Sequence, residues 1–200
     1  MNLDRSYIRD IIAMCQNRKL SRQQCAYVLA TAWHETGGMR WLKEIWGPTD
    51  AQRRYEGRDD LGNTQKGDGW RFMGRGFVHI TGRRNYTDWS KRLGVDLVAD
   101  PEKAMQPTIA ATILVDGMRL GTFTGKKLSD YINSGKTDFV RARRVVNVNN
   151  RAELIASYAV EFDSALAADG YSIAPAAAPI PEKQPWWVAL VQLIAKLWSK

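Results

Sequence analysis

The chain has 200 residues, 44% hydrophobic and 25% charged, which suits one medium-sized globular domain or one domain with a short appendage. The formal net charge of +8 indicates a polyanionic partner or surface, such as nucleic acid, anionic lipid or the acidic polymers of a bacterial wall. Two cysteines, Cys15 and Cys25, are too few for a disulfide framework, and without clustered histidines they make a poor metal site. We therefore expect two reduced thiols on packed helices.

The first forty residues predict two helices that pack as a hairpin. Apolar residues spaced for one buried face predict a helix over 4–19. Ser21 and Gln24 then have the spacing of a capping box, which predicts a second helix from about residue 23. Two consecutive glycines, Gly37 and Gly38, are expected to end that helix.

Residues 39–70 are rich in glycine and charge, which predicts a long loop with at most a short helix around 49–55. Long ordered loops inside compact domains tend to be functional. Alternation after this loop predicts a short strand from Phe77, with Phe77, His79 and Thr81 on the face that lines a groove. A helix is expected to follow over 85–93.

The sequence pattern predicts that the rest of the domain is helical. Asp100 and Pro101 resemble a helix start, and residues 104–120 are apolar enough to form a central buried helix. Further helices are expected from about 128, over 139–146, and over 153–167, which would be the last core helix. We therefore predict a mainly α fold with a small β element.

The last part of the chain differs in composition. We divide the sequence into a domain over 1–172, a Pro/Ala-rich linker over 173–185, and an amphipathic C-terminal helix over 186–200. This last segment is shorter than the about 20 residues needed to span a bilayer. It could lie on an anionic membrane surface, with tryptophans and lysines in their usual places, or dock on an apolar patch of the domain itself.

The most informative carboxylate is that of Glu35, in the predicted last turn of the second helix. The negative end of the helix and partial desolvation beside Trp33 would both disfavour the charged form and raise the pKa of Glu35. A carboxylic acid that keeps its proton near neutral pH can protonate the leaving oxygen in glycoside hydrolysis. Such a mechanism also needs a second carboxylate.

Other chemistries fit the motifs less well. A zinc-protease motif at His34–Glu35 would need a second histidine at position 38, where the chain has Gly38. His79 could orient a serine, but no serine stands in a glycine-flanked elbow. The glycine pairs near 67 and 74 lack the full spacing of a phosphate loop. Three nearby arginines could contact nucleic acid, but they are more simply explained as part of a solvated helix face: Arg141, Arg143 and Arg144.

Two long motifs carry a family resemblance. Residues 34–38 (HETGG) and 74–86 (GRGFVHITGRRNY), in this order, resemble the family 19 glycoside hydrolases, and the sequence is most similar to their bacteriophage endolysin branch. The resemblance covers roughly residues 25–165 and leaves out the linker and terminal helix. It implies an inverting enzyme with a mostly helical, lysozyme-like domain of two lobes, and no metal or organic cofactor.

The resemblance also implies roles for individual residues. Glu35 takes the general-acid position, and Thr81 matches a Ser/Thr that helps to hold the attacking water. Asn85 and Tyr86 match residues that bind sugar in the cleft. Further candidates for substrate contact are His34, Glu56, His79, where the family usually has glutamine, and Asn147, which falls near a family asparagine.

The second carboxylate is expected in the loop after Glu35. Glu44 lies nine residues further on, the spacing of the endolysin branch, whereas Glu56 lies 21 residues further on, nearer the spacing of plant chitinases. We take Glu44 as the base and keep Glu56 in reserve. The other loop carboxylates, Asp59, Asp60 and Asp68, could equally pair with neighbouring arginines.

These observations predict a monomeric endolysin that hydrolyses the glycan strands of peptidoglycan and does not bind nucleic acid. The N-terminus lacks the apolar core of a secretory signal, so we expect the protein to stay in the host bacterial cytoplasm until a holin-type lesion releases it to the cell wall. Two rival functions remain open: a chitinase acting on N-acetylglucosamine polymers, and a membrane-active protein that kills through its Trp/Lys tail.

Overall fold

A computed structural model describes residues 1–147 and 151–173; the linker and the C-terminal helix expected over 173–200 fall almost wholly outside these residues. The described chain is mainly helical, as predicted. Its elements are α1 (Ser6–Asn17), α2 (Arg22–Glu35), α3 (Asp50–Arg53), η1 (Asp59–Leu61), α4 (Asp68–Arg71), α5 (Arg83–Leu93), η2 (Pro101–Met105), α6 (Pro107–Leu120), η3 (Leu128–Asp130), β1 (Ile132–Asn133), β2 (Lys136–Thr137), η4 (Arg141–Val145) and α7 (Ala152–Ala168), where η denotes a 3₁₀ helix.

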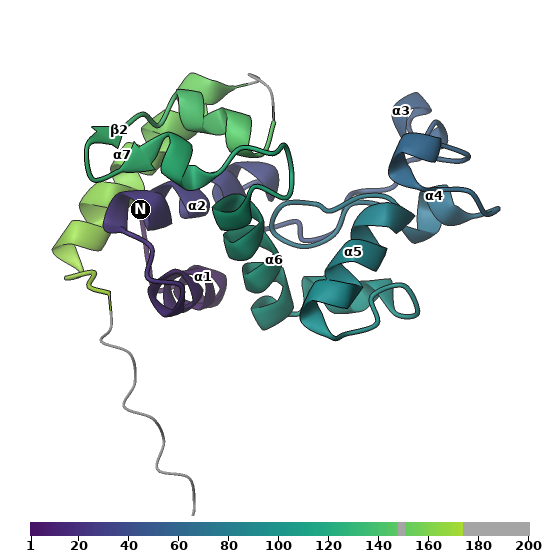
Figure 1. Cartoon of the computed structure of the whole chain (residues 1–200), viewed down its shortest axis with the longest axis horizontal. Coiled ribbons are helices and arrows are strands. Elements are labelled where there is room, and N and C mark those ends of the chain that lie inside the picture. The colour runs from purple at the N-terminus through teal and green to yellow at the C-terminus, as the bar shows by residue number, and fades with distance from the viewer. Residues whose placement is uncertain (148–150, 174–200) are drawn as a thin grey trace, which may run out of the picture.

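The helices form two lobes, which Figure 1 shows side by side. The larger lobe contains α1, α2, α6, α7 and the small β hairpin, and its core includes Ile11, Leu29 and Phe162. The smaller lobe contains α3, α4 and α5, around a separate core that includes Phe72 and Trp89. The two-lobed arrangement expected from the family resemblance is confirmed.

Helix α6 joins the lobes because its apolar residues point to both cores. Leu114 packs in the larger core, while Ile113, the preceding residue, packs in the smaller one. The predicted central helix over 104–120 is confirmed only from Pro107 onward. Gln106 has extended backbone angles, as expected for a residue before proline, and it separates α6 from the 3₁₀ helix η2.

The two N-terminal helices begin and end close to the predicted residues. The capping box at Ser21 and Gln24 is present, with Gln24 N–H donating to Ser21 Oγ at 3.2 Å. However, α2 packs chiefly against α7, and α1 packs chiefly against α6, so the expected hairpin is a minor contact. Cys15 and Cys25 are both free thiols, fully buried in the larger core, as predicted.

The strand predicted from Phe77 is wrong. The segment instead turns tightly: Ile80 N–H donates to Arg75 O at 3.0 Å, and His79 has a left-handed φ of 48°. The residues do not alternate in burial, because Phe77 and Ile80 are both buried. The small β element predicted from the sequence lies elsewhere, as the antiparallel pair β1–β2.

Candidate active site

Glu35 is the last residue of α2. Thr36 ends the helix by folding its Oγ1 back onto Ala32 O, at 2.6 Å, and two glycines with positive φ follow. The Glu35 side chain is 23% exposed and accepts a hydrogen bond from Arg143 Nη1 at 2.7 Å. The helix therefore presents the carboxylate at its C-terminal end, next to a fixed cation.

The cation that Glu35 meets is not a surface residue. Arg143 lies in the 3₁₀ helix η4 and is only 3% exposed, so the sequence-based explanation of Arg143 as part of a solvated helix face is wrong. A guanidinium stabilises the ionised form of a carboxylate, whereas the helix end disfavours that form. The two influences oppose one another, and the expected protonation of Glu35 stays a prediction.

Glu44 lies between α2 and α3 and is held by neutral donors. Its Oε1 accepts from Gln52 Nε2 at 2.9 Å and from Tyr55 Oη at 3.3 Å, and its Oε2 accepts from Gly74 N–H at 3.0 Å. In the part of the chain that the structure describes, no lysine or arginine forms an ion pair with it. Burial, and then the nearby Glu44 carboxylate, raise the pKa of Tyr55.

Thr81 lies beside Glu44, because both are next to Gly74. A Cβ built on Gly74 would lie 3.3 Å from Glu44 Oε2 and 3.4 Å from Thr81 Oγ1. The Thr81 hydroxyl donates to His79 O at 3.0 Å, so its lone pairs remain able to accept a hydrogen bond from a water molecule. The structure thus brings together Glu44 and Thr81, two of the three predicted catalytic residues.

His79 is partly exposed and contacts the backbone of Trp41, and its expected sugar contact stays a prediction. Its Nε2 lies 2.9 Å from Trp41 O, and its Cβ would be 3.0 Å from a Cβ on Gly74. Trp41 is 51% exposed and its ring lies against Gly37. Sequence reasoning missed Trp41, although an aromatic residue between Glu35 and Glu44 was a usable signal for a sugar-binding surface.

Two predicted sugar-binding residues have different surroundings. Asn85 is exposed, and its Nδ2 donates to Thr81 O at 2.7 Å, so it lies next to the candidate site. Tyr86 is fully buried in the core of the smaller lobe, where its hydroxyl donates to Met73 O at 2.8 Å. The expected sugar contact of Tyr86 is therefore corrected to a packing role, and burial raises its pKa to about 12.

His34 and Asn147 lie on the Glu35 side of the site. His34 is partly buried and helps to line a pocket of about 320 Å³ next to Trp33; burial lowers its pKa. Asn147 is exposed, and its backbone N–H donates to Arg143 O at 2.9 Å, which links it to the partner of Glu35.

Glu56 has a structural explanation. Its carboxylate accepts hydrogen bonds from the backbone N–H groups of Gly67, at 2.6 Å, and Gly69, at 2.9 Å, and so anchors the glycine-rich loop before α4. Two other loop carboxylates pair with arginines: Asp60 with Arg58, and Asp68 with Arg83. Among the loop carboxylates, Glu44 is the one that the structure places next to Thr81.

Within residues 1–147 and 151–173, no group of three or more His, Cys, Asp or Glu side chains is arranged to hold a metal ion. Within the same residues, every helix is too short or too polar to cross a membrane.

Comparison with known proteins supports the family resemblance over part of the chain. No family model matches. Over 52 residues the chain is 44% identical to a glycosyl hydrolase family 19 domain-containing protein of Haemophilus influenzae. The match spans 26% of this chain and about a quarter of that relative's length. A crystal structure of a chitinase C mutant is similar with a TM-score of 0.49 and 18% sequence identity, covering 77% of this chain and 75% of that one. The resemblance to glycosyl hydrolase family 19 is confirmed by the sequence match.

Proposed function

We propose that this protein, which resembles glycosyl hydrolase family 19, is an inverting glycoside hydrolase that cleaves β-1,4 bonds in the glycan strands of bacterial peptidoglycan. Glu35 is the general acid, Glu44 is the general base, and Thr81 helps to hold the attacking water. We further propose that the protein acts as an endolysin, in which cleavage of the wall lyses the host cell.

The contrast between the two carboxylates carries this proposal. Glu44 is held by two neutral side chains and a backbone N–H, so its charge is not cancelled by a cation in the described residues. Glu35 stands at a helix end against a buried arginine. Two carboxylates in such different environments can divide the roles of acid and base, and the resemblance of residues 34–38 to the family motif gives the acid role to Glu35.

In the proposed reaction, Glu35 gives a proton to the glycosidic oxygen as the bond to the anomeric carbon breaks. Glu44 takes a proton from a water molecule, and the water oxygen attacks the anomeric carbon from the opposite face of the sugar. Inverting enzymes need about 6.5–9.5 Å between the two carboxyl groups to admit that water. The Thr81 hydroxyl, next to Glu44, accepts the second hydrogen of the water and fixes its direction.

The net charge of +8 favours peptidoglycan over chitin, because the stem peptides and accessory polymers of bacterial walls carry negative charge and chitin is uncharged. The same charge would hold a released enzyme on the wall and, through residues 186–200, on an anionic membrane. Release from the host cytoplasm through a holin-type lesion would bring the enzyme to its substrate.

The test is mass analysis of the products released from purified sacculi and from soluble chitin oligosaccharides by wild type, Glu35→Gln and Glu44→Gln. We expect fragments from sacculi with wild type and at least a hundredfold slower release with either variant. The identity of the new reducing end, muramic acid or glucosamine, names the bond that is cleaved. Faster cleavage of chitin oligosaccharides would assign a chitinase instead.

A lysis assay on outer-membrane-permeabilised cells separates catalysis from killing by the tail. Loss of lysis in folded Glu35→Gln supports hydrolysis. Unchanged lysis by that variant, together with loss of lysis on deletion of residues 175–200, would assign the activity to the Trp/Lys tail and overturn the proposal.

A further inference from the structure

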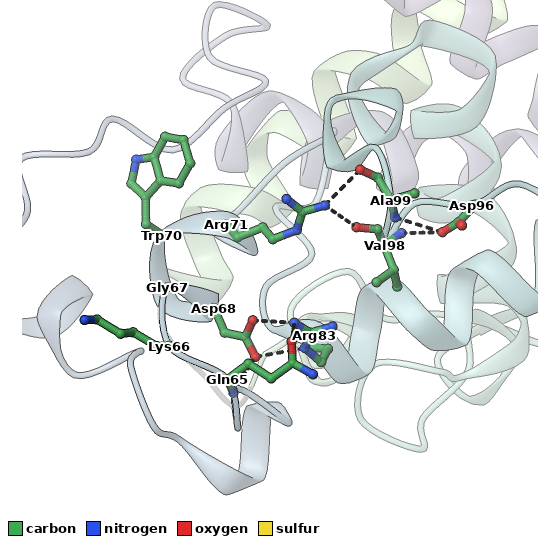
Figure 2. Close-up of a pocket in the computed structure, with 10 residues that line it drawn as sticks. All are labelled: Gln65, Lys66, Gly67, Asp68, Trp70, Arg71, Arg83, Asp96, Val98 and Ala99. Carbon is green, nitrogen blue, oxygen red and sulfur yellow. Dashed lines mark hydrogen bonds and ion pairs between the residues drawn. The ribbon is translucent and has the colours of Figure 1, made fainter.

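A pocket of about 570 Å³ lies in the smaller lobe. Its walls come from the loop before α4, from α4 itself, from the start of α5 and from residues 96–99 (Figure 2). Glu35, Glu44 and Thr81 are not among the residues that line it. Its volume is within the about 300–1,000 Å³ typical of small-molecule sites.

An exposed aromatic ring stands at the edge of this pocket. Trp70 is 59% exposed, and in Figure 2 its indole stands apart from the other labelled side chains. The short helix α4 that carries it, and the loop before that helix, are held from two sides: Glu56 accepts from Gly67 and Gly69, and buried Asp68 is ion-paired with Arg83 at 2.6 Å. The ring is therefore presented to solvent by a fixed backbone, which lowers the entropy cost of binding to it.

The opposite side of the pocket is polar and also held in place. Arg71 Nη2 donates to Val98 O at 2.8 Å and to Ala99 O at 2.9 Å. Arg83 is held by Asp68 and lies over the Phe72 ring, 4.7 Å from its centroid. Among the described residues, Nη1 of Arg71 and Nη1 of Arg83 make no hydrogen bond, so each guanidinium keeps donors for a ligand.

An acceptor completes the polar side. Asp96 uses Oδ1 to accept from the backbone N–H groups of Val98, at 3.0 Å, and Ala99, at 2.9 Å. Its Oδ2 has no hydrogen-bond donor within the part of the chain that is described. The pocket therefore combines one flat apolar surface with oriented donors and a carboxylate acceptor, which is the set of groups that a pyranose ring with hydroxyl and acetamido substituents requires.

We propose that this pocket is a second glycan-binding site, which takes an acetamido-sugar unit of the polymer while the candidate active site cleaves another part of the strand. The sugar ring stacks on Trp70, and its hydroxyl and acetamido groups bond to Arg71, Arg83 and Asp96. The site raises the affinity for long, insoluble glycan more than for short oligosaccharides. This inference rests on the proposed function, because the same polymer occupies both sites.

The test is co-sedimentation with purified sacculi, carried out in full-length Glu35→Gln protein so that cleavage does not consume the substrate. We expect the further change Trp70→Ala to weaken binding about tenfold, since an aromatic face is lost. The further change Trp70→Phe, which keeps a flat ring, should restore most of the binding. Because Trp70 is largely exposed, thermal melting should show an unchanged fold.

The matched control is Val160→Ala, which shortens another exposed apolar side chain, on α7 of the larger lobe. This control should bind sacculi like its parent. The proposal is overturned if Trp70→Ala binds sacculi as tightly as its parent, or if inorganic phosphate displaces the protein at concentrations where a tetrasaccharide of N-acetylglucosamine does not. Failure of the proposed function would look different: wild type would release no fragments from sacculi, whatever residue 70 is.

Discussion

Replacing Arg143 by methionine tests whether the ion pair with Glu35 holds the larger lobe together at the candidate active site. The pair joins η4 to the end of α2 with an N–O distance of 2.7 Å, and the two side chains are only 4% and 23% exposed. Breaking a buried pair by removing one partner costs about 3–5 kcal/mol. Because Glu35 keeps some contact with water, we expect the lower end, about 3 kcal/mol.

For a chain of this size, 1 kcal/mol lowers the melting temperature by about 2–4 °C, so Arg143→Met should melt roughly 6–12 °C below wild type. The control is Arg141→Met on the same 3₁₀ helix, where an exposed arginine lies 3.6 Å from Asp138. Exposed pairs contribute about 0–1 kcal/mol, so this control should melt within about 4 °C of wild type.

A double-mutant cycle with Glu35→Gln completes the test. If the two side chains act on each other, Arg143→Met should cost less in the Glu35→Gln background than in wild type, by about 1 kcal/mol or more. Calorimetric or circular dichroism melts measure all four proteins. Additive effects, or a melting temperature of Arg143→Met equal to that of Arg141→Met, would refute the assignment of Arg143 as the fixed partner of Glu35.

Three further predictions concern the site and its supports. Gly74→Ala should lower kcat at least tenfold, since the new methyl group would lie 3.3 Å from the Glu44 carboxylate. The control Gly135→Ala, whose new methyl group would have its closest contact at 3.8 Å, should have wild-type kinetics. Equal rates for the two variants would contradict the proposed crowding of Glu44. Glu56→Gln should lower the free energy of unfolding by about 1 kcal/mol in denaturant titrations, because the carboxylate accepts two backbone hydrogen bonds, yet it should keep most of the hydrolytic rate. A hundredfold loss of rate would instead make Glu56 the base. Burial lowers the pKa of His34, so the unfolded state takes up a proton first as the pH falls through about 6.5, and stability is lost on the acid side. The melting temperature of His34→Gln should therefore fall less between pH 7 and 5 than that of wild type. Parallel curves of melting temperature against pH for the two proteins would argue against this cause.

Local signals in the sequence predicted the parts of the fold that depend on neighbouring residues. The capping box at Ser21 and the glycines after Glu35 fix the ends of α2, because caps and left-handed residues act within a few positions of the chain. The same reasoning failed around His79, where alternation over residues 77–81 suggested a strand. A tight turn closed by Arg75 and Ile80 overrides so short a pattern.

The contacts that define the site could not be predicted in the same way. Arg143 lies 108 residues from Glu35, and in sequence it is one of several arginines on an apparently solvated stretch. Only the packing of η4 against α7 and η3 decides that this arginine, and not Arg141 or Arg144, is buried. The burial of Tyr86 was missed for a related reason, since a motif matches residue types and does not report which face of α5 meets the core.

The two buried thiols give this protein an internal probe of its own opening. Cys15 in α1 and Cys25 in α2 are both fully buried, and burial, assisted by the adjacent Cys25, raises the pKa of Cys15 well above that of a free thiol. Only a thiolate reacts with alkylating reagents, so labelling requires the helices of the larger lobe to separate first. The alkylation rate in native buffer therefore reports the free energy of that separation, and the same measurement on Arg143→Met would show whether losing an ion pair at one end of α2 loosens the packing at its other end.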